Sequence, residues 1–283
     1  MLWGVLPIFW KALDTVGSVE ILAHRIVWSV VFLGVIIAIR GSWDEIRGLS
    51  PAVARRLLVA GSLLALNWAT YIWAVNNGHI VESSLGYFIN PLLNVVLGVL
   101  ILRERLEPMQ WLAVGIATCG VAYMTIGVGS LPWIALVLAI SFALYALLKK
   151  QMRAVGPIES LTVEVALVLL PALAFLGVLA WSGEGAFWAD GPRVTVLLVL
   201  TGVATALPLL LFGAAAHRIQ LTTIGLLQYI APSMQFLIGV FLYDEIVGRD
   251  RLIGFILVWA ALVIYSGHGL ARRRRGEPQP LAV

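Results

Sequence analysis

The stretch WATYIWAVNNGHIVESSLGYFINPLLNVVLGVLILRE, residues 68–104, decides the fold, because it places amides, a tyrosine and a proline inside apolar runs long enough to cross a bilayer. It reads as a helix, a short turn and a second helix. On the second helix Tyr87, Asn90 and Asn94 are spaced at i, i+3 and i+7, so they share one face. Hydrocarbon disfavours such a face, which turns instead toward a bundle interior or an aqueous cavity. The stretch therefore predicts a membrane protein with a polar pathway or binding site.

The same stretch recurs 141 residues further along the chain, and the aligned pairs include Leu85 with Leu226, Pro91 with Pro232, Gly98 with Gly239 and Glu104 with Glu245. The polar face recurs as well, since Gln228 and Gln235 align with Tyr87 and Asn94. Proline removes a helical hydrogen bond and clashes with the preceding turn, so both prolines predict helix kinks. Internal repeats are the common architecture of secondary transporters, whose site lies where the two halves meet.

Composition places the chain among integral membrane proteins. Of its 283 residues, 61% are hydrophobic and 12% are charged, whereas charged residues make up about a quarter of soluble domains. The single Cys119 allows no disulfide framework, and the four histidines are too dispersed for a metal site. We therefore expect no metal and no cofactor. The net charge of +4 comes from basic residues at the ends of apolar segments, which argues against a nucleic-acid partner.

The hydropathy pattern predicts ten membrane spans. Residues 1–12 are apolar but shorter than the roughly 20 residues that a span needs, so the first helix is expected to be short. The other nine predicted spans are Glu20–Arg40, Leu57–Asn77, Glu82–Leu102, Pro108–Val128, Trp133–Leu148, Ile158–Trp181, Val194–Ala216, Leu221–Tyr243 and Leu252–Leu270.

Basic residues in the loops predict the orientation. With the N-terminus in the cytoplasm, fourteen Lys and Arg residues fall on the cytoplasmic side and four on the other, as the positive-inside rule requires. We predict a first five-helix repeat at 1–128, a second at 129–271 and a basic cytoplasmic tail at 272–283. Five helices per repeat force the second repeat to enter from the opposite side, so the repeats are expected to be inverted.

Four motifs carry a resemblance to a known family, and they are HRIVWS at 24–29, NWATYIWAVNNGH at 67–79, ESSLGYFINPLLNVVLGVL at 82–100 and LLQYIAPSMQFLIGVFLYDE at 226–245. Together they resemble the RarD-type members of the drug/metabolite transporter superfamily, whose repeat unit is the EamA domain. The resemblance covers nearly the whole chain. Members normally carry another turn or two of apolar helix before the residues that match Trp3 and Gly4, which predicts a truncated first helix.

The resemblance implies a ten-helix permease of the bacterial inner membrane, with a central cavity lined mainly by helices 1, 3, 4, 6, 8 and 9. The subgroup's label as chloramphenicol-sensitivity proteins implies permeation of drugs or metabolites, and other branches of the superfamily export amino acids and similar metabolites. We therefore expect export of a small molecule by alternating access. The expected surroundings are the lipid bilayer, and the expected state is a monomer or weak homodimer.

Nine side chains are candidates for substrate binding because they are polar or aromatic and fall deep in predicted spans, namely Asn67, Trp68, Tyr71, Asn76, Tyr87, Asn90, Asn94, Gln228 and Gln235. We expect seven of them, all but Trp68 and Asn76, to converge on one cavity. The alternative is a purely structural role, in which the amides only form hydrogen bonds between helices, and Pro91 and Pro232 only form kinks that let helices cross closely.

Six charged residues are candidates for gating or coupling, namely Lys11, Arg25, Glu104, Lys149, Glu164 and Glu245. Arg25 could instead be tethered at the interface by a snorkelling stem. Glu164 could carry a coupled proton or pair with Lys149 or Lys150 at the inner boundary. We interpret Glu104 and Glu245, which follow their spans beside arginines, as gate or boundary ion pairs on opposite sides.

The chain carries no catalytic motif that would indicate an intramembrane enzyme, and we predict no catalytic residue. A passive channel is the nearest rival, although rings of like charge and a carbonyl filter segment are missing from the sequence. Amides can satisfy donors and acceptors alike, so the expected substrate is neutral or zwitterionic, amino-acid-like or amphenicol-like, with a planar or apolar part.

Overall fold

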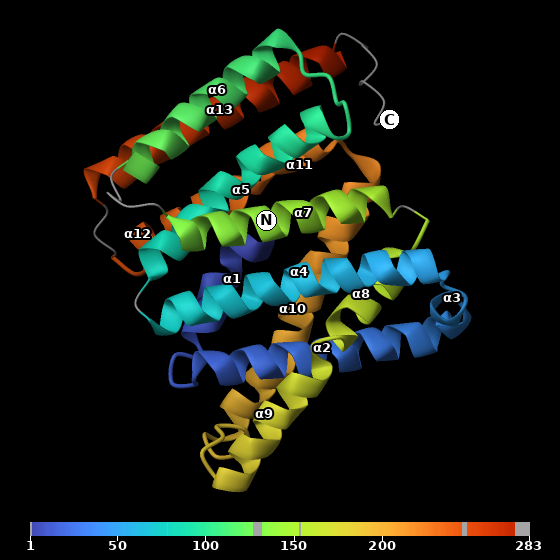
Figure 1. Cartoon of the computed structure of the whole chain (residues 1–283). Helices are drawn as coiled ribbons and strands as arrows, with labels where there is room; N and C mark the ends of the chain where they lie inside the picture. The colour runs from blue at the N-terminus through green and yellow to red at the C-terminus, as the bar shows by residue number, and fades with distance from the viewer. Residues whose placement is uncertain (1, 78, 127–131, 153, 245–247, 275–283) are drawn as a thin grey trace. The chain divides into compact units, whose positions relative to one another are not determined.

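The computed structural model describes residues 2–77, 79–126, 132–152, 154–244 and 248–274 (Figure 1). The side chains of 75, 76, 80, 81, 250, 251, 270 and 272–274 are outside the described part. The regular elements described are all α-helices, and they are α1 (Leu2–Lys11), α2 (Ser18–Arg40), α3 (Trp43–Arg47), α4 (Pro51–Asn76), α5 (Ile80–Leu100), α6 (Pro108–Ile126), α7 (Trp133–Gln151), α8 (Pro157–Ala166), α9 (Leu169–Ser182), α10 (Pro192–Arg218), α11 (Leu221–Gln228), α12 (Ile230–Leu242) and α13 (Arg249–Arg274).

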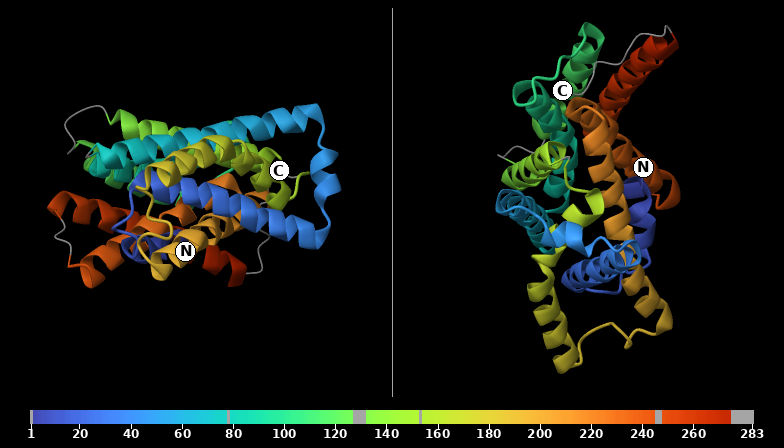
Figure 2. Two further views of the ribbon diagram at one scale, coloured as in Figure 1. Left: turned by 90° about the horizontal axis from the view of Figure 1, so that it is seen from below. Right: turned by 90° about the vertical axis from the view of Figure 1, so that its right-hand side faces the viewer.

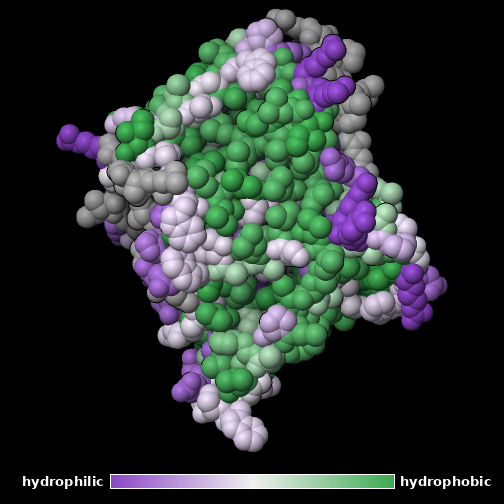
Figure 3. Space-filling model, in the orientation of Figure 1, coloured by the Kyte–Doolittle hydropathy of each residue, from purple (hydrophilic) through white to green (hydrophobic). Residues whose placement is uncertain are grey.

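Length and apolar composition give the described helices eight candidate membrane spans. One of these is formed by α11 and α12 together. A ninth results if α8 and α9, which meet at an angle of 51°, count as one span. Helix α1 has 10 residues, shorter than a span, so the predicted count of ten stays a prediction. The face in Figure 3 is covered mostly by apolar side chains, with hydrophilic ones gathered at its edges.

The chain divides into two compact units, and each takes helices from both predicted repeats. Unit 1 comprises Met1–Val5, Asn77–Leu147 and Arg218–Val283, and unit 2 comprises Leu6–Asn76 and Leu148–His217. In unit 1, α5 packs against α11 and α6 packs against α13 (Figure 1). A buried apolar core that includes Phe88, Val121, Tyr229 and Phe255 lies among these helices. The division at 128 remains a prediction from the repeat.

The repeat-related helices of unit 1 pack antiparallel. The residue numbers of the contact partners decrease as α5 advances. Phe88 of α5 contacts Tyr229, just after α11, whereas Gly98 lies against Thr222 near the start of α11. Along α6 the partners on α13 fall in the same way, because Glu107 contacts His268 and Gly120 lies against Leu257. Antiparallel packing of two helices that share a sequence repeat is what an inverted repeat requires.

The turn after each repeated helix also has the same backbone conformation. Arg103 and Asp244 align in the 141-residue repeat, and their φ angles are 55° and 52°. A positive φ is uncommon for residues other than glycine, because Cβ crowds the backbone there. Its recurrence at aligned positions shows that the repeat extends from the sequence to the fold of these turns.

Unit 2 is built around α2, which packs against α4, α8 and α9. The pairing of α2 with α8 and α9 is antiparallel, since Ser42 after the end of α2 contacts Glu159 of α8, while Glu20 contacts Ala186 after the end of α9. Residues 183–191 connect α9 to α10 (Figure 2, right). Gly202 of α10 faces the backbone of Trp28 so closely that a Cβ there would lie 2.3 Å from it. Two helices that approach this closely hold their side chains in a fixed register.

The predicted span Ile158–Trp181 is a broken helix, and proline accounts for the break. Helix α8 ends at Ala166 and α9 begins at Leu169. Pro171 lacks the N–H that would bond the carbonyl of Leu167, and its ring crowds that carbonyl. The repeat-related helix α2 has no proline and runs unbroken for 23 residues.

Candidate functional site

Three of the predicted amides form a hydrogen-bonded group in unit 1, which we term the amide cluster and which consists of Asn90, Asn94 and Gln228. Asn94 Nδ2 donates to Gln228 Oε1 and, at 3.3 Å, to Asn90 Oδ1. Asn90 Nδ2 donates in turn to the carbonyl of Ala139 in α7 at 3.0 Å. Asn90 is 6% exposed and Asn94 is fully buried. The cluster therefore connects α5, α7 and α11 through neutral groups.

Asn94 has an acceptor that the cluster does not use. Its Oδ1 atom is buried and has no hydrogen-bond partner among the described residues. A buried acceptor without a donor is disfavoured by about 1–3 kcal/mol, and native proteins have few of them. Asn94 Oδ1 is therefore an acceptor of the amide cluster that no described residue satisfies.

Glycine and proline position Gln228. A Cβ on Gly225 would lie 2.5 Å from the carbonyl oxygen of Pro91, so only glycine lets α11 approach α5 at this point. Helix α11 ends at Gln228, four residues before Pro232, whose missing N–H leaves the Gln228 carbonyl without its helical bond. The predicted kink at Pro232 thus coincides with a break, whereas α5 continues through Pro91 as one helix.

Other predicted binding residues of unit 1 lie apart from these contacts. Gln235 of α12 donates to the carbonyl of Trp3 at 2.9 Å. Tyr87 is 50% exposed, in contrast with Asn90 and Asn94 on the same helix. Asn76, which belongs to unit 2, ends α4, and its side chain lies outside the described residues. The convergence of all the predicted residues on one cavity stays a prediction.

Arg25 is the centre of a second group, in unit 2, which we term the arginine cluster and which consists of Arg25, Trp10, Trp68, Tyr71 and Thr205. The guanidinium carbon lies over the Trp10 ring at 4.9 Å from its centroid and over the Trp68 ring at 5.5 Å. Arg25 Nε donates to Thr205 Oγ1 at 2.9 Å. Tyr71 lies near enough to Arg25 for an electrostatic interaction between its phenol and the Arg25 charge. Asn67, the neighbour of Trp68, is half-buried.

Lys149, Ser160 and Glu164 form a third group, the ionic cluster, also in unit 2. Lys149 Nζ lies 2.9 Å from Glu164 Oε1, and both residues are 1% exposed. Ser160 Oγ accepts from Lys149 and donates to Glu164 at 2.6 Å. Glu164 thus has Lys149 as its ion-pair partner, one of the two arrangements expected for it.

The remaining gating candidates have simpler surroundings. Lys11 is exposed and lies 4.0 Å from Asp14. Glu104, expected in an ion pair, instead accepts the backbone N–H groups of Leu221 at 2.7 Å and Thr222 at 2.9 Å. These donors at the start of α11 have no helical partner, and a carboxylate satisfies them while opposing the positive end of the helix dipole. Glu245 lies outside the described residues.

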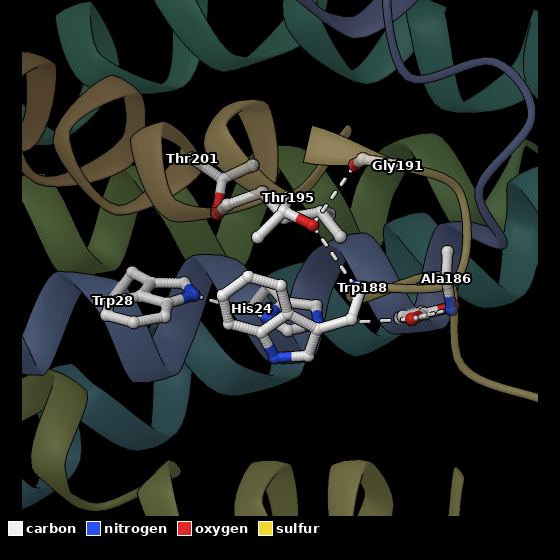
Figure 4. Close-up of polar contacts among 9 residues, drawn as sticks. His24, Trp28, Ala186, Trp188, Gly191, Thr195 and Thr201 are labelled. Atoms are coloured by element: carbon white, nitrogen blue, oxygen red, sulfur yellow. Dashed lines mark hydrogen bonds and ion pairs between the residues drawn. The ribbon is translucent and has the colours of Figure 1, made fainter. Parts of the chain in front are cut away.

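A polar group that sequence reasoning did not predict joins α2 to the loop after α9 (Figure 4). Glu20 Oε1 accepts from the backbone N–H of Ala186 at 2.7 Å, and Trp28 Nε1 donates to His24 Nδ1 at 3.3 Å. His24 is 5% exposed and stacks on Phe187 with ring centroids 4.9 Å apart. Glu20 stands three residues after Gly17, as Glu159 stands three after Gly156. That spacing does not by itself indicate burial, because Gly41 and Asp44 share it and Asp44 is exposed.

The fold and these polar groups define a class: a polytopic α-helical membrane protein built from an internal repeat, with charged and amide side chains buried among its helices. The model of the EamA-like transporter family matches residues 1–126. The chain is 48% identical to "Protein RarD" of Streptomyces exfoliatus over 98% of this chain and 88% of that protein. It is 43% identical to an uncharacterised transporter of Pseudomonas aeruginosa, over 99% of this chain and 94% of that one.

The chain therefore belongs to the RarD-type branch of the EamA-like transporter family in the drug/metabolite transporter superfamily. It is a bacterial multi-pass membrane transporter and not an enzyme. A protein of known crystal structure is 19% identical and superimposes with a TM-score of 0.72 over 96% of this chain and 95% of its own. That likeness concerns the fold alone.

Proposed function

We propose that this chain is a secondary transporter that exports a small neutral or zwitterionic solute, amino-acid-like or amphenicol-like, with a planar or apolar part. It acts by alternating access in the bacterial inner membrane, with both termini in the cytoplasm. The excess of basic residues in the loops on one side supports this orientation, and membership of the transporter family supports the inner membrane.

The observation that carries the proposal is the amide cluster with its unused Asn94 acceptor. Asn94 Oδ1 is buried without a partner, while Asn94 Nδ2 is engaged with Asn90 and Gln228. Interhelical amide bonds contribute only about 0.6–2 kcal/mol in membranes, so packing alone gives little reason to bury such a group. A solute that donates an N–H or O–H to Asn94 supplies the missing bond.

The chemistry of the cluster supports a solute of mixed polarity. Amides offer donors and acceptors without selecting a charge sign. The Lys149 charge is neutralised by Glu164 at 2.9 Å, and Lys11 is exposed beside Asp14, so neither supports a site for a dianion.

Alternating access is supported by the antiparallel pairing of repeat-related helices in unit 1. Inverted repeats let one protein adopt two related conformations that open to opposite sides of the membrane. The break between α11 and α12 falls beside Gln228 of the amide cluster, and discontinuous helices of this kind form many transporter sites.

The test is solute flux by the purified protein in liposomes, screened against amino acids, other metabolites and amphenicols. For a transported solute, we expect Asn94→Ala to lower flux at least about tenfold, with normal membrane insertion. The matched control is Thr118→Ala on α6, whose hydroxyl is exposed and bonds within its own helix to Val114 at 2.8 Å. Wild-type flux is expected there.

Two further variants extend the test to the other predicted residues. Asn90→Ala removes a donor to Ala139, and Tyr71→Ala removes a phenol from unit 2. Both should impair flux without disturbing the hydropathy that drives insertion. Wild-type flux by Asn90→Ala, Asn94→Ala and Tyr71→Ala at equal expression contradicts the proposal. Saturable flux that is stimulated by solute on the opposite side supports a carrier, whereas unsaturable flux supports a channel.

A further inference from the structure

We propose that two repeat-related carboxylates, Glu20 and Glu159, are gate residues that hold the two sides of the transporter closed in turn. The inference rests on the proposed alternating access and deepens it by naming the gates. Glu20 bonds Ala186 in the loop after α9, and Glu159 bonds Ser42 just after α2, so each contact joins one predicted repeat to the other. We term the Glu20–Ala186 contact the first latch and the Glu159–Ser42 contact the second latch.

The two carboxylates occupy equivalent positions at the start of the second helix of each predicted repeat. The segment VGSVE at 16–20 matches VGPIE at 155–159. The glycine before each helix has nearly the same backbone conformation, with φ −58° and ψ 136° at Gly17 and φ −57° and ψ 146° at Gly156. Both carboxylates are buried, 7% exposed at Glu20 and 2% at Glu159. One local structure therefore occurs twice, once in each repeat.

The latches lie at the two ends of α2. Glu20 is in the first turn of this helix, and Ser42 follows its last residue closely. Helix α2 has 23 residues and is a candidate membrane span. At 1.5 Å per residue it is about 34 Å long, so one latch lies near each face of the membrane. In the predicted orientation the first latch is the outer one.

Between the latches, α10 holds α2 near its middle. A Cβ on Gly202 of α10 would lie 2.3 Å from the backbone of Trp28, and Ser29 Oγ donates to the Gly202 carbonyl at 3.1 Å. A close contact at one point resists sliding but allows a helix to tilt about that point. Tilting opens one end of α2 and presses the other against its partner, which is the rocking motion of alternating access.

Each latch is a single charge-assisted contact that can break and re-form. In the first latch the carboxylate accepts the loop N–H at 2.7 Å, and the next loop residue, Phe187, stacks on His24 with ring centroids 4.9 Å apart (Figure 4). In the second latch the Ser42 hydroxyl donates to the carboxylate at 3.0 Å. A hydrogen bond to a charged group is stronger than a neutral one, yet its net contribution is of the size that separates two conformations of one protein.

The test is distance measurement between spin labels by double electron–electron resonance, on the full-length protein in lipid nanodiscs without solute. Cys119 is replaced by serine. One label pair, Thr15→Cys with Ala189→Cys, reports the separation at the first latch. The other pair, Glu45→Cys with Ala154→Cys, reports the separation at the second latch. All four label positions are exposed.

The two glutamine variants remove one charge each and keep the shape of the side chain. Glu20→Gln should raise the ratio of long to short distances about fivefold at the first latch and lower it at the second. Glu159→Gln should do the reverse. Phe187→Ala and Ser42→Ala weaken the same two latches from the partner side and should reproduce these shifts, which retains the test if a glutamine variant does not fold.

The matched controls are exposed carboxylates next to each latch. Glu184→Gln lies in the same loop as Ala186, and Asp44→Asn lies in α3, two residues after Ser42. Both variants should leave the two distance distributions as in the wild type.

Opposite shifts at the two ends separate a pair of gates from two structural clamps, because breaking a clamp at one end does not close the other. Unchanged distances in both glutamine variants, lengthening at the altered end alone, or lengthening at both ends overturn the proposal. No solute is present, so the result is independent of flux. If the shifts are opposite while Asn94→Ala keeps wild-type flux, the proposed role of the amide cluster fails and the latches stand. If Asn94→Ala lowers flux and the distances do not shift, the latches fail and the amide cluster stands.

Discussion

The amide cluster of unit 1 and the ionic cluster of unit 2 are both buried polar groups within membrane spans, yet they satisfy their bonds in different ways. In the ionic cluster, Lys149, Ser160 and Glu164 bond to one another and their charges cancel. In the amide cluster, the Asn94 side chain donates twice while its own oxygen has no partner among the described residues.

This difference suggests that the ionic cluster stabilises the fold, whereas the amide cluster binds the solute. Removing one partner of a buried ion pair leaves an uncompensated charge, so the ionic cluster should dominate stability. Interhelical amide bonds are weak in membranes, so the amide cluster should matter less for folding and more for recognition. Each prediction below changes one side of this comparison.

The largest effect is expected from Lys149→Met. The substitution leaves Glu164 buried, 1% exposed, without the cation 2.9 Å away. Breaking a buried pair from one side is destabilising by about 3–5 kcal/mol. Thermal unfolding in detergent, followed by tryptophan fluorescence, should show a clear loss of stability or of folded yield.

The double variant Lys149→Met with Glu164→Leu is the control for that prediction. It removes both charges, and well-packed apolar replacements of buried pairs are often neutral or stabilising. We expect most of the lost stability to return. A double variant no more stable than the single one contradicts the assignment of the loss to an unpaired charge.

Gly225→Ala should have the next largest effect, now on the amide cluster. The new Cβ would meet the Pro91 carbonyl oxygen at 2.5 Å and Asn94 Cβ at 3.0 Å. Backbone cannot yield as a flexible side chain does, so α11 should move away from α5, destabilising the fold by about 1–3 kcal/mol and separating Gln228 from Asn94. Reduced solute flux should accompany the lower unfolding temperature.

Gly177→Ala in α9 is the matched glycine control, because nothing lies within 4 Å of its added Cβ. Alanine favours a helix over glycine by about 1 kcal/mol, so this variant should be neutral or slightly stabilised. Equal losses from the two substitutions argue against close helix approach at Gly225.

The sequence predicts the fold class well, because the fold class depends on local patterns, whereas the role of the predicted site residues stays a prediction. Apolar runs identified the spans, and spacing along one helix grouped Asn90 with Asn94. The antiparallel packing of α5 on α11 agrees with the inversion that the odd number of helices per predicted repeat implies.

What the sequence alone could not predict are contacts between distant residues. Thr205 lies 180 residues from Arg25, and Ala186 lies 166 from Glu20, so no local pattern pairs them. Arg25 contacts Trp10, Trp68 and Thr205 within unit 2, which differs from the alternative of an arginine tethered at the membrane interface. The break at Leu167 is a different case, since Pro171 was visible in the sequence and its effect four residues earlier follows from proline geometry.

Glu104→Gln tests a carboxylate that is held by backbone donors instead of a cation. Both Glu104 oxygens accept N–H groups at the start of α11, from Leu221 and Thr222. Glutamine turns an NH₂ group toward one of these donors and removes the charge that opposes the helix dipole, so a loss of about 1–2 kcal/mol is expected. Glu45→Gln on the exposed helix α3 should leave the unfolding temperature unchanged, and an equal shift in both variants contradicts the capping role.

The smallest effect is expected from Gly213→Ala, the counterpart of Gly225→Ala beside the ionic cluster. The added Cβ would lie 3.2 Å from Lys149 Cε and 3.7 Å from Pro157 Cβ. Its nearest neighbour is thus the far end of a flexible side chain, which can shift by a few tenths of an ångström while Nζ keeps its bond to Glu164. The gain in helix propensity, about 1 kcal/mol, opposes that strain. The unfolding free energy should therefore change by less than about 0.5 kcal/mol, well below the loss for Gly225→Ala. A loss as large as that of Gly225→Ala would mean that the lysine cannot yield and that the ionic cluster is as rigid as the backbone contact at Pro91.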